Sequence, residues 1–390
     1  MTLDRLEPLA PETVSLEESV GRVTADPIAA RVDSPSVDAS LKDGFAVRSA
    51  DLAQVDAGRP VSLKIIGQVA AGASSDQTVQ PGTAVRVLTG ARIPTQADAV
   101  LSEEYAEVLG DRLLARKGAE PGRNILPRGS DVRLGKLILP AGELISPGQA
   151  GLLAAAGHDK VSVFRRPAVS IIATGDEVVV PGKPLGEGKL YASNLITLNA
   201  WCRRYGMQVR LAVVKDDARA LEEALAQAVV LSDSVITSGG AWTGDRDMVV
   251  KTLDRMGWQQ VFHRIRIGPG KAVGFGLLHD KAVFILPGGP PSNLMGFLQI
   301  ALPGLLRLGG HRRAGLPTIL VELAQDVTGR YADWTQFVYG VIENKDHKTR
   351  FHAIKRTSRL QSMAEAQAIV MVPEGETCLP AGKMVRAQRL

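Results

Sequence analysis

Three apolar runs rich in β-branched residues lie in the middle of the chain, at residues 168–173, 234–237 and 282–286, and each runs into a glycine-bearing polar turn. Runs of this length and composition predict buried strands. Helical patterns at 193–205 and 218–231 lie between the first two runs and are long enough for right-handed crossovers. The pattern therefore predicts an α/β domain with a parallel-rich sheet over residues 166–313.

The pattern of apolar positions changes on both sides of this domain. Between residues 37 and 121, short β-like runs alternate with Gly and Pro turns, which predicts an inserted β domain. The flanking segments 1–36 and 122–165 are expected to pack together as a discontinuous linker domain. Spaced β runs over residues 314–390 predict a small C-terminal barrel or sandwich.

Composition narrows the class of protein. A chain of 390 residues is expected to form several domains. The two cysteines, Cys202 and Cys378, do not indicate a disulfide framework, and the first 16 residues lack the order of a signal peptide. No apolar run approaches the roughly 20 residues that span a bilayer. We therefore expect a cytoplasmic protein that does not bind membranes.

The net charge of +5 is a modest excess for this length, and aromatic residues make up only 4% of the chain. No basic patch is interleaved with the stacking rings of single-strand binders, so a nucleic-acid partner is not expected. The six histidines show no ligand spacing to one another, which argues against a zinc site.

The candidate binding residues follow the three predicted strands, because ligands of open parallel sheets bind at the carboxyl ends of the strands. Backbone amides at such turns can bind anions, and carboxylates there can hold a cation against a phosphate. The candidates are Thr174, Gly175, Asp176 and Glu177 after the first strand, Ser238, Gly239, Gly240, Asp245 and Asp247 after the second, and Pro287, Gly288, Pro290 and Ser292 after the third.

Each charged candidate has an ordinary alternative. Asp245 and Asp247 can stabilise the first turn of a helix, and Glu177 can be a solvated turn residue. Asp233, one residue before its strand, can lie on the surface, as can Lys271 in its Gly/Pro-rich turn. Taken together they favour phosphate or oxyanion transfer with a divalent ion. The chain has no P-loop, no Gly-x-Ser-x-Gly elbow and no histidine placed for a triad.

A series of motifs along the chain resembles a known family, the molybdopterin molybdenumtransferases of the MoeA and gephyrin E-domain group. Any single motif is weak, but the order of the whole series is specific. The matching blocks lie at residues 43–48, 86–91, 122–125, 173–177, 191–194, 238–240, 244–247, 269–271 and 286–292.

The resemblance implies a four-part fold: a discontinuous linker domain, an inserted β domain, a three-layer α/β domain like that of MogA and MoaB, and a C-terminal β barrel. It implies a homodimer in which the inserted domain of one subunit faces the α/β pocket of the other. The implied reaction inserts molybdate into adenylylated molybdopterin and releases AMP with the help of Mg2+. Implied partners are the molybdopterin adenylyltransferase and the molybdoenzymes that accept the cofactor.

The resemblance also implies roles for individual residues. Asp43 and Thr89 would reach the site from the neighbouring subunit, and Glu177, Asp233 and Asp247 would be functional carboxylates. Of these, Glu177 and Asp247 are expected to hold Mg2+ against the pyrophosphate. The residues expected to position phosphate or molybdate are Ser238, Lys271 and Ser292.

The chain departs from the family's usual residues at several positions, and these departures keep two other functions open. One is a paralogue that inserts tungstate or regulates cofactor supply, and the other is a non-catalytic scaffold of the same fold. The departures include Ala39, Leu41, Lys42, Ala192, Gly268, Gly289 and Pro291.

Overall fold

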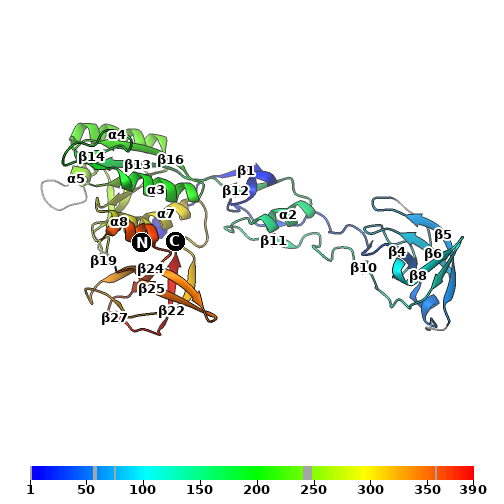
Figure 1. Cartoon of the computed structure of the whole chain (residues 1–390). Coiled ribbons are helices and arrows are strands. Elements are labelled where there is room, and N and C mark those ends of the chain that lie inside the picture. The colour runs from blue at the N-terminus through cyan, green and yellow to red at the C-terminus, as the bar shows by residue number, and fades with distance from the viewer. Residues whose placement is uncertain (1, 56–58, 74–75, 240–247, 356–357) are drawn as a thin grey trace.

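The computed structural model describes residues 2–55, 59–73, 76–239, 248–355 and 358–390. Figure 1 shows an elongated molecule in which the α/β domain and the C-terminal barrel pack together at one end. The linker lies in the middle and the inserted β domain at the other end. No helix within the described ranges is both long enough and apolar enough to cross a membrane.

The α/β domain is built on a six-stranded sheet of order β16-β13-β17-β21-β20-β18. Its first four strands run parallel, so their carboxyl ends share one edge, and the last two pair antiparallel. A short parallel pair, β14 (Val178–Val179) and β15 (Leu190–Tyr191), follows β13. The sheet strands are β16 (Gln208–Val214), β13 (Ala168–Thr174), β17 (Ser234–Ser238), β21 (Lys281–Leu286), β20 (Gly274–Leu278) and β18 (Gln259–His263).

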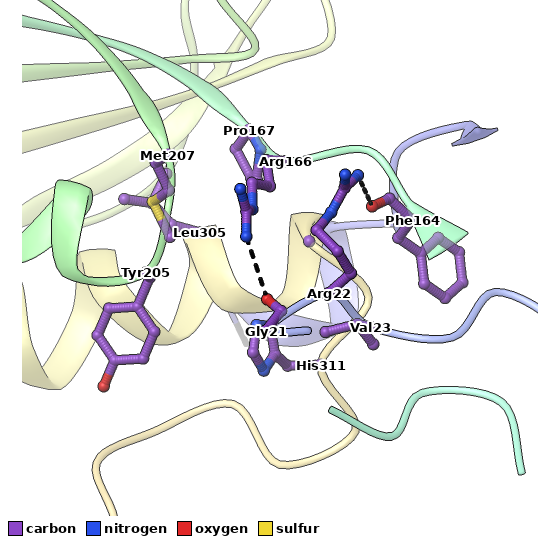
Figure 2. A pocket seen from close by; sticks show the side chains of 11 residues that line it. Gly21, Arg22, Val23, Phe164, Arg166, Pro167, Tyr205, Met207, Leu305 and His311 are labelled. Atoms are coloured by element: carbon purple, nitrogen blue, oxygen red, sulfur yellow. Dashed lines mark hydrogen bonds between the residues drawn. The ribbon is translucent and has the colours of Figure 1, made fainter. Parts of the chain in front are cut away.

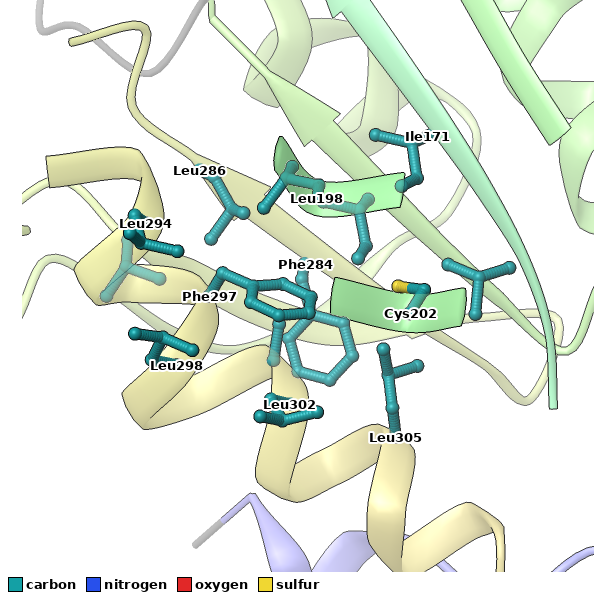
Figure 3. Close-up of a cluster of buried hydrophobic side chains, with 14 of the residues drawn as sticks. Ile171, Leu198, Cys202, Phe284, Leu286, Leu294, Phe297, Leu298, Leu302 and Leu305 are labelled. Atoms are coloured by element: carbon teal, nitrogen blue, oxygen red, sulfur yellow. The ribbon is translucent and has the colours of Figure 1, made fainter. Parts of the chain in front are cut away.

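Helices cover both faces of this sheet, because alternate side chains of each buried strand point to opposite faces. On one face Ile171 and Phe284 pack with Leu198 and Leu305, as Figure 3 shows. The helices of that face are α3 (Ser193–Arg204), α6 (Pro290–Gly296) and α7 (Leu302–Leu308), with a π-helical segment η4 (Phe297–Ala301) between the last two. The other face is covered by α4 (Ala218–Leu231) and α5 (Met248–Arg255).

The C-terminal domain is a closed barrel. Its strands are hydrogen-bonded in the order β24-β25-β22-β28-β26, and β26 pairs again with β24 to close the ring. A short helix, α8 (Arg359–Glu365), lies between β25 and β26 and packs against α6 of the α/β domain. The strands are β22 (Thr318–Leu323), β24 (Thr335–Lys345), β25 (Lys348–Ala353), β26 (Ala368–Val372) and β28 (Met384–Arg389), with a side pair β23 (Val327–Thr328) and β27 (Cys378–Leu379) and the added β19 (Ile267–Gly268).

The inserted domain is an open six-stranded sheet of order β7-β4-β6-β5-β9-β8, built around the fully buried Phe45. Its strands are β4 (Gly44–Val47), β5 (Val61–Val69), β6 (Thr83–Val87), β7 (Ala99–Ser102), β8 (Ala106–Leu109) and β9 (Arg112–Ala115). Three short 3-10 helices of the chain are η1 (Leu3–Arg5), η2 (Ser49–Leu52) and η3 (Glu103–Tyr105).

The chain runs through the linker twice, in opposite directions. Three antiparallel pairs hold the two passages together, and the third pair stands where the inserted domain begins and ends. These pairs are β1 (Pro11–Ser15) with β12 (Lys160–Phe164), β2 (Ile28–Ala29) with β11 (Leu137–Leu139), and β3 (Ala39–Ser40) with β10 (Ile125–Leu126); the linker helices are α1 (Leu16–Ser19) and α2 (Pro147–Ala155). The predicted fold class is confirmed in all four parts.

Arg166 joins the α/β domain to the linker, and Arg22 beside it binds two strands of the linker (Figure 2). Arg22 pairs with Glu12 and donates to the carbonyl oxygen of Phe164 at 3.1 Å, while Arg166 reaches the carbonyl oxygen of Gly21 at 3.5 Å. The cavity that they line is only about 20 Å³. Since that volume admits little more than one water molecule, this junction serves attachment and is too small for a substrate.

Candidate active site

The ends of the three predicted strands meet. Gly239, directly after β17, has a φ of +107°, and a Cβ there would lie 2.6 Å from the carbonyl oxygen of Thr174 at the end of β13. A Cβ on Gly288, which follows β21, would lie 3.7 Å from the Cα of Gly239. The backbone at 239 can approach its neighbour this closely only because glycine has no side chain.

A cavity of about 1200 Å³ opens at this edge of the sheet. Its volume exceeds the upper end of the usual range for small-ligand pockets, about 1000 Å³, so a ligand of dinucleotide size fits. Most of its wall belongs to the α/β domain, and one residue, Leu360, comes from α8 of the barrel. The predicted binding residues that line it are Thr174, Gly175, Glu177, Ser238, Gly239, Gly288 and Pro290.

Ser238 is the centre of a hydrogen-bond network in the cavity. Its Oγ accepts from Nδ2 of Asn194 at 3.2 Å and from Nδ2 of Asn293 at 3.0 Å. The same two amide groups donate to the carbonyl oxygens of Gly288 and Pro287, at 2.8 and 2.9 Å. Because a carbonyl oxygen can only accept, the side-chain amides of Asn194 and Asn293 must both point their nitrogen towards these carbonyls and towards Ser238. The two bonds that they donate occupy both lone pairs of the Ser238 hydroxyl oxygen. No other residue that the structure describes takes the hydroxyl proton of Ser238, which can therefore donate to a ligand oxygen.

A second hydroxyl lies at the same edge. Thr174 is buried, lines the cavity, and its Oγ1 has no hydrogen-bond partner within the described residues. A buried hydroxyl without a partner costs free energy, on the order of 1–3 kcal/mol. Because this oxygen is itself buried, Thr174 could donate to a ligand only if its hydroxyl turned towards the cavity.

The sequence also predicted free backbone amides at these turns, and at two positions that prediction is wrong. The amide of Gly175 donates to the carbonyl oxygen of Val214 at 3.3 Å, and the amide of Gly239 donates to that of Leu286 at 3.0 Å. Sheet pairing thus continues one residue past each strand. These two amides are therefore not free to bind an anion.

Among the described residues, two carboxylates line the cavity, Glu177 and Asp216. Glu177 is exposed and lies over Gly175, where a Cβ would come within 2.7 Å of its carboxylate. Asp176 does not line the cavity, and its Oδ1 accepts from the amide of Asp216 at 3.3 Å. No group of three or more His, Cys, Asp or Glu side chains able to hold a metal occurs among the residues that the structure describes.

Other predicted binding residues lie outside the cavity wall. Pro287 is buried, and its carbonyl oxygen accepts from Asn293. The Nζ of Lys271 lies 5.2 Å from the ring centroid of Trp334 in the barrel. Ser292 contacts the loop before Lys271 through its carbonyl oxygen, 3.4 Å from a Cβ placed on Gly270. Three further predicted residues, Gly240, Asp245 and Asp247, lie outside the described residues.

The structure does not bring Asp233 to this site, and this corrects the prediction. Asp233 precedes β17 and therefore lies at the amino edge of the sheet, whereas Ser238 ends the strand at the carboxyl edge. Its carboxylate accepts from Arg165 at 2.7 and 2.9 Å and from the amide of Ala168 at 2.8 Å. Burial opposes ionisation, but these hydrogen bonds outweigh it and lower the pKa of Asp233. Its contacts join the first residues of β13 and β17.

Asp43 directly precedes β4 and Thr89 follows β6, so both belong to the inserted domain, which lies at the other end of the molecule from the α/β domain (Figure 1). The Oδ1 of Asp43 accepts from the amide of Thr89 at 2.6 Å and from its hydroxyl at 2.8 Å. These bonds, with the charge of Arg86, lower the pKa of Asp43. Asp43 is thus an exposed, ionised carboxylate held in one orientation.

The prediction of binding residues from the sequence left out several residues of the site, namely Asn293, Asn194, Asp216, Leu190, Tyr191 and Leu360. Asn293 and Asn194 each stand in a turn or helix start next to a predicted strand end, which was an available signal. Leu360 carried no such signal, because it belongs to a separate domain.

Comparison with known proteins agrees with this architecture. Residues 1–157 match the family model "MoeA N-terminal region (domain I and II)", and residues 170–307 match "Probable molybdopterin binding domain". A Nostoc protein named molybdopterin molybdenumtransferase is 30% identical over 386 residues, covering 97% of this chain and 88% of its own. A Bacillus subtilis protein of the same name is 30% identical and covers 96% and 89%.

Solved structures give the same result for the whole chain. A structure of the molybdopterin biosynthesis moeA protein from Pyrococcus horikoshii superposes with a TM-score of 0.85 at 29% identity, covering all of this chain and 97% of that one. Another structure of the Pyrococcus protein gives a TM-score of 0.83 at 31% identity, covering 99% and 96%. The chain therefore belongs to the molybdopterin molybdenumtransferase family, whose members are transferases of molybdenum cofactor biosynthesis.

Proposed function

We propose that the cavity at the carboxyl edge of the α/β sheet binds adenylylated molybdopterin and molybdate, and that molybdenum insertion there releases AMP. The observation that carries this proposal is the Ser238 network. It leaves the hydroxyl proton of Ser238 without an acceptor among the described residues, and phosphate and molybdate oxygens are groups that can accept it.

The described residues divide the work in the cavity. Ser238, held at a packed strand end, donates to oxygens of the pyrophosphate or of molybdate, and Thr174 would add a second donor once its buried hydroxyl turned towards the cavity. Donors fixed before the reaction stabilise charge that develops on the phosphate when the phosphoanhydride bond breaks. Lys271 would add positive charge only by moving from its position on Trp334 towards the cavity.

The carboxylates of the cavity fit a magnesium ion in their chemistry, since Mg2+ prefers oxygen ligands and commonly uses one or two carboxylates plus phosphate oxygens. Glu177, with Asp247, would hold it there. The bound ion would neutralise negative charge on the phosphates. The finding that the described residues form no larger cluster of metal ligands agrees with a cation held partly by the substrate.

The active unit is proposed to be a homodimer. Asp43 and Thr89 lie in the inserted domain at the other end of the elongated chain, so a second subunit would have to bring them to the cavity. A mixture of Asp43→Ala and Ser238→Ala chains tests this. Half of the randomly formed dimers would hold one intact site, so activity would return to about a quarter of the wild-type value. No recovery, with mixed dimers shown to form, would contradict a shared site.

The reaction itself is tested by supplying the purified chain with adenylylated molybdopterin and Mg2+, and either molybdate or tungstate, and measuring AMP. Molybdate-dependent release that EDTA abolishes supports the proposal. Preference for tungstate would instead support a paralogue with a changed oxyanion, and no release with either anion would support a scaffold.

A further inference from the structure

The barrel contributes one helix to the wall of the cavity. α8 lies at the boundary between the barrel and the α/β domain (Figure 1) and packs against α6, whose first residue Pro290 also lines the cavity. Met363 of α8 packs on the apolar cluster of the α/β domain, which anchors the helix there. At the start of α8 the Oγ of Ser358 accepts from the amide of Gln361 at 3.4 Å. The position of the next residues is thus fixed by both domains.

Leu360, on the first turn of α8, lines this cavity, and 52% of its surface is exposed. Isolated exposed leucines are common on protein surfaces. Leu360 differs because two more exposed apolar side chains, Leu190 and Tyr191 of β15, line the same cavity at 51% and 40% exposure. The hydroxyl of Tyr191 donates to the carbonyl oxygen of Lys183 at 3.1 Å, which fixes its orientation.

The cavity therefore has two kinds of wall. Ser238, Asn194 and Glu177 supply hydrogen-bonding and charged groups, whereas Leu360, Leu190 and Tyr191 supply apolar surface. A ligand that matches both walls has an anionic part and a flat apolar part. Covering the apolar part removes exposed hydrocarbon from water on both the protein and the ligand, and aromatic side chains favour stacked rings.

We propose that Leu360 is a substrate-contacting residue that covers a planar heteroaromatic ring of the adenylylated pterin together with Tyr191, so that the C-terminal barrel forms part of the substrate site. This inference rests on the proposed function. Both the adenine and the pterin are flat ring systems, and the binding measurements below distinguish which of them contacts Leu360. Leu360 makes no contribution to the bond-breaking step, because it carries no polar group.

The test compares Leu360→Ala with Leu360→Met and with a control, Leu320→Ala. Leu320 lies on β22 of the same barrel, is 60% exposed and does not line the cavity. Leu360→Ala should raise the KM for adenylylated molybdopterin about tenfold with kcat unchanged, the pattern of lost uniform binding. Leu360→Met keeps most of the apolar volume, so its KM should stay close to the wild-type value. The control Leu320→Ala should match the wild type.

Binding measurements then identify the ring. Weaker binding of AMP by Leu360→Ala assigns adenine to this wall, and weaker binding of molybdopterin assigns the pterin. Inorganic pyrophosphate has no ring and should bind all variants equally. Unchanged KM and unchanged binding of both ring ligands would overturn the inference. Because the binding measurements need no turnover, they remain decisive even if the wild type releases no AMP, an outcome that would count against the proposed function alone.

Discussion

Replacing Asp233 with asparagine should destabilise the α/β domain and leave AMP release intact. The carboxylate of Asp233 accepts two hydrogen bonds from Arg165 and one from the amide of Ala168, and only 8% of the residue is exposed. Asparagine keeps one side-chain oxygen, which can still accept the hydrogen bond from the amide of Ala168. Its amide group would face the guanidinium, which can only donate, so the paired contact with Arg165 is lost.

The size of the effect follows from the exposure of the partner. Hydrogen bonds to charged groups contribute roughly 1.5–3 kcal/mol each to stability when buried. The side chain of Arg165 is 42% exposed, so water can replace part of what the guanidinium loses. We therefore expect the free energy of unfolding to fall by about 2 kcal/mol in total.

Urea unfolding followed by tryptophan fluorescence, to which the buried Trp258 of the α/β domain contributes, measures this change, with Asp254→Asn as control. Asp254 is an exposed carboxylate on α5 of the same domain, and its change should stay within about 0.5 kcal/mol. The rate of AMP release at 25 °C should equal that of the wild type. Loss of AMP release with an unchanged unfolding curve would refute the reasoning and return Asp233 to catalysis.

The same pair of proteins should show a defined dependence on pH. The pKa of Asp233 is lowered in the folded chain, so its contribution to stability is complete above its unfolded pKa of about 3.9 and is lost as pH falls through the folded value. The difference in unfolding free energy between wild type and Asp233→Asn should therefore narrow below about pH 4. A constant difference down to pH 3 would mean that the carboxylate charge is not what stabilises the strand ends.

Three further predictions concern other residues. Ser238→Ala should lower kcat on the order of 100-fold, because it removes a fixed hydrogen-bond donor. The kinetics of AMP release measure this, and a rate within threefold of the wild type would contradict it. Gly239→Ala should abolish binding of molybdopterin in a titration, since its Cβ would lie 2.6 Å from the carbonyl oxygen of Thr174; unchanged affinity would contradict the close packing of the strand ends. Burial raises the pKa of the Cys202 thiol to about 12, so a thiol reagent at pH 8 should label only the exposed Cys378 in the folded chain. Unfolding in urea should make Cys202 react as well. Rapid labelling of both cysteines in the folded chain would contradict the burial of Cys202.

Much of the α/β domain was predictable because its signals are local. The helix predicted at 218–231 matches α4, since apolar residues recur on one face and Asp217 caps its first turn through the amide of Ala220. The β runs predicted over residues 314–390 likewise form the strands of the barrel, β22 and β26 among them. By contrast α8 was missed, because seven residues between two β runs carry too short a pattern, and its position depends on contacts with α6.

The site was predictable as a location and less so as a set of contacts. Strand direction alone brings Thr174, Ser238 and Gly288 to one edge. The same reasoning places Asp233 at the other edge, because it precedes its strand; its selection came from resemblance and not from topology. The sequence could not show that the amides of Gly175 and Gly239 are used by neighbouring strands, since this depends on how far the pairing continues.

The antiparallel pairing of β3 with β10 makes the inserted domain a detachable module. Ala39 lies beside Leu126 and Ser40 beside Ile125, so the chain leaves the linker and returns to it at one point. A tight turn joining those two strands could bypass everything between them without stretching the backbone. The shortened chain would keep the cavity and lose Asp43 and Thr89, and the excised piece could be grafted as a cassette between relatives of different anion preference.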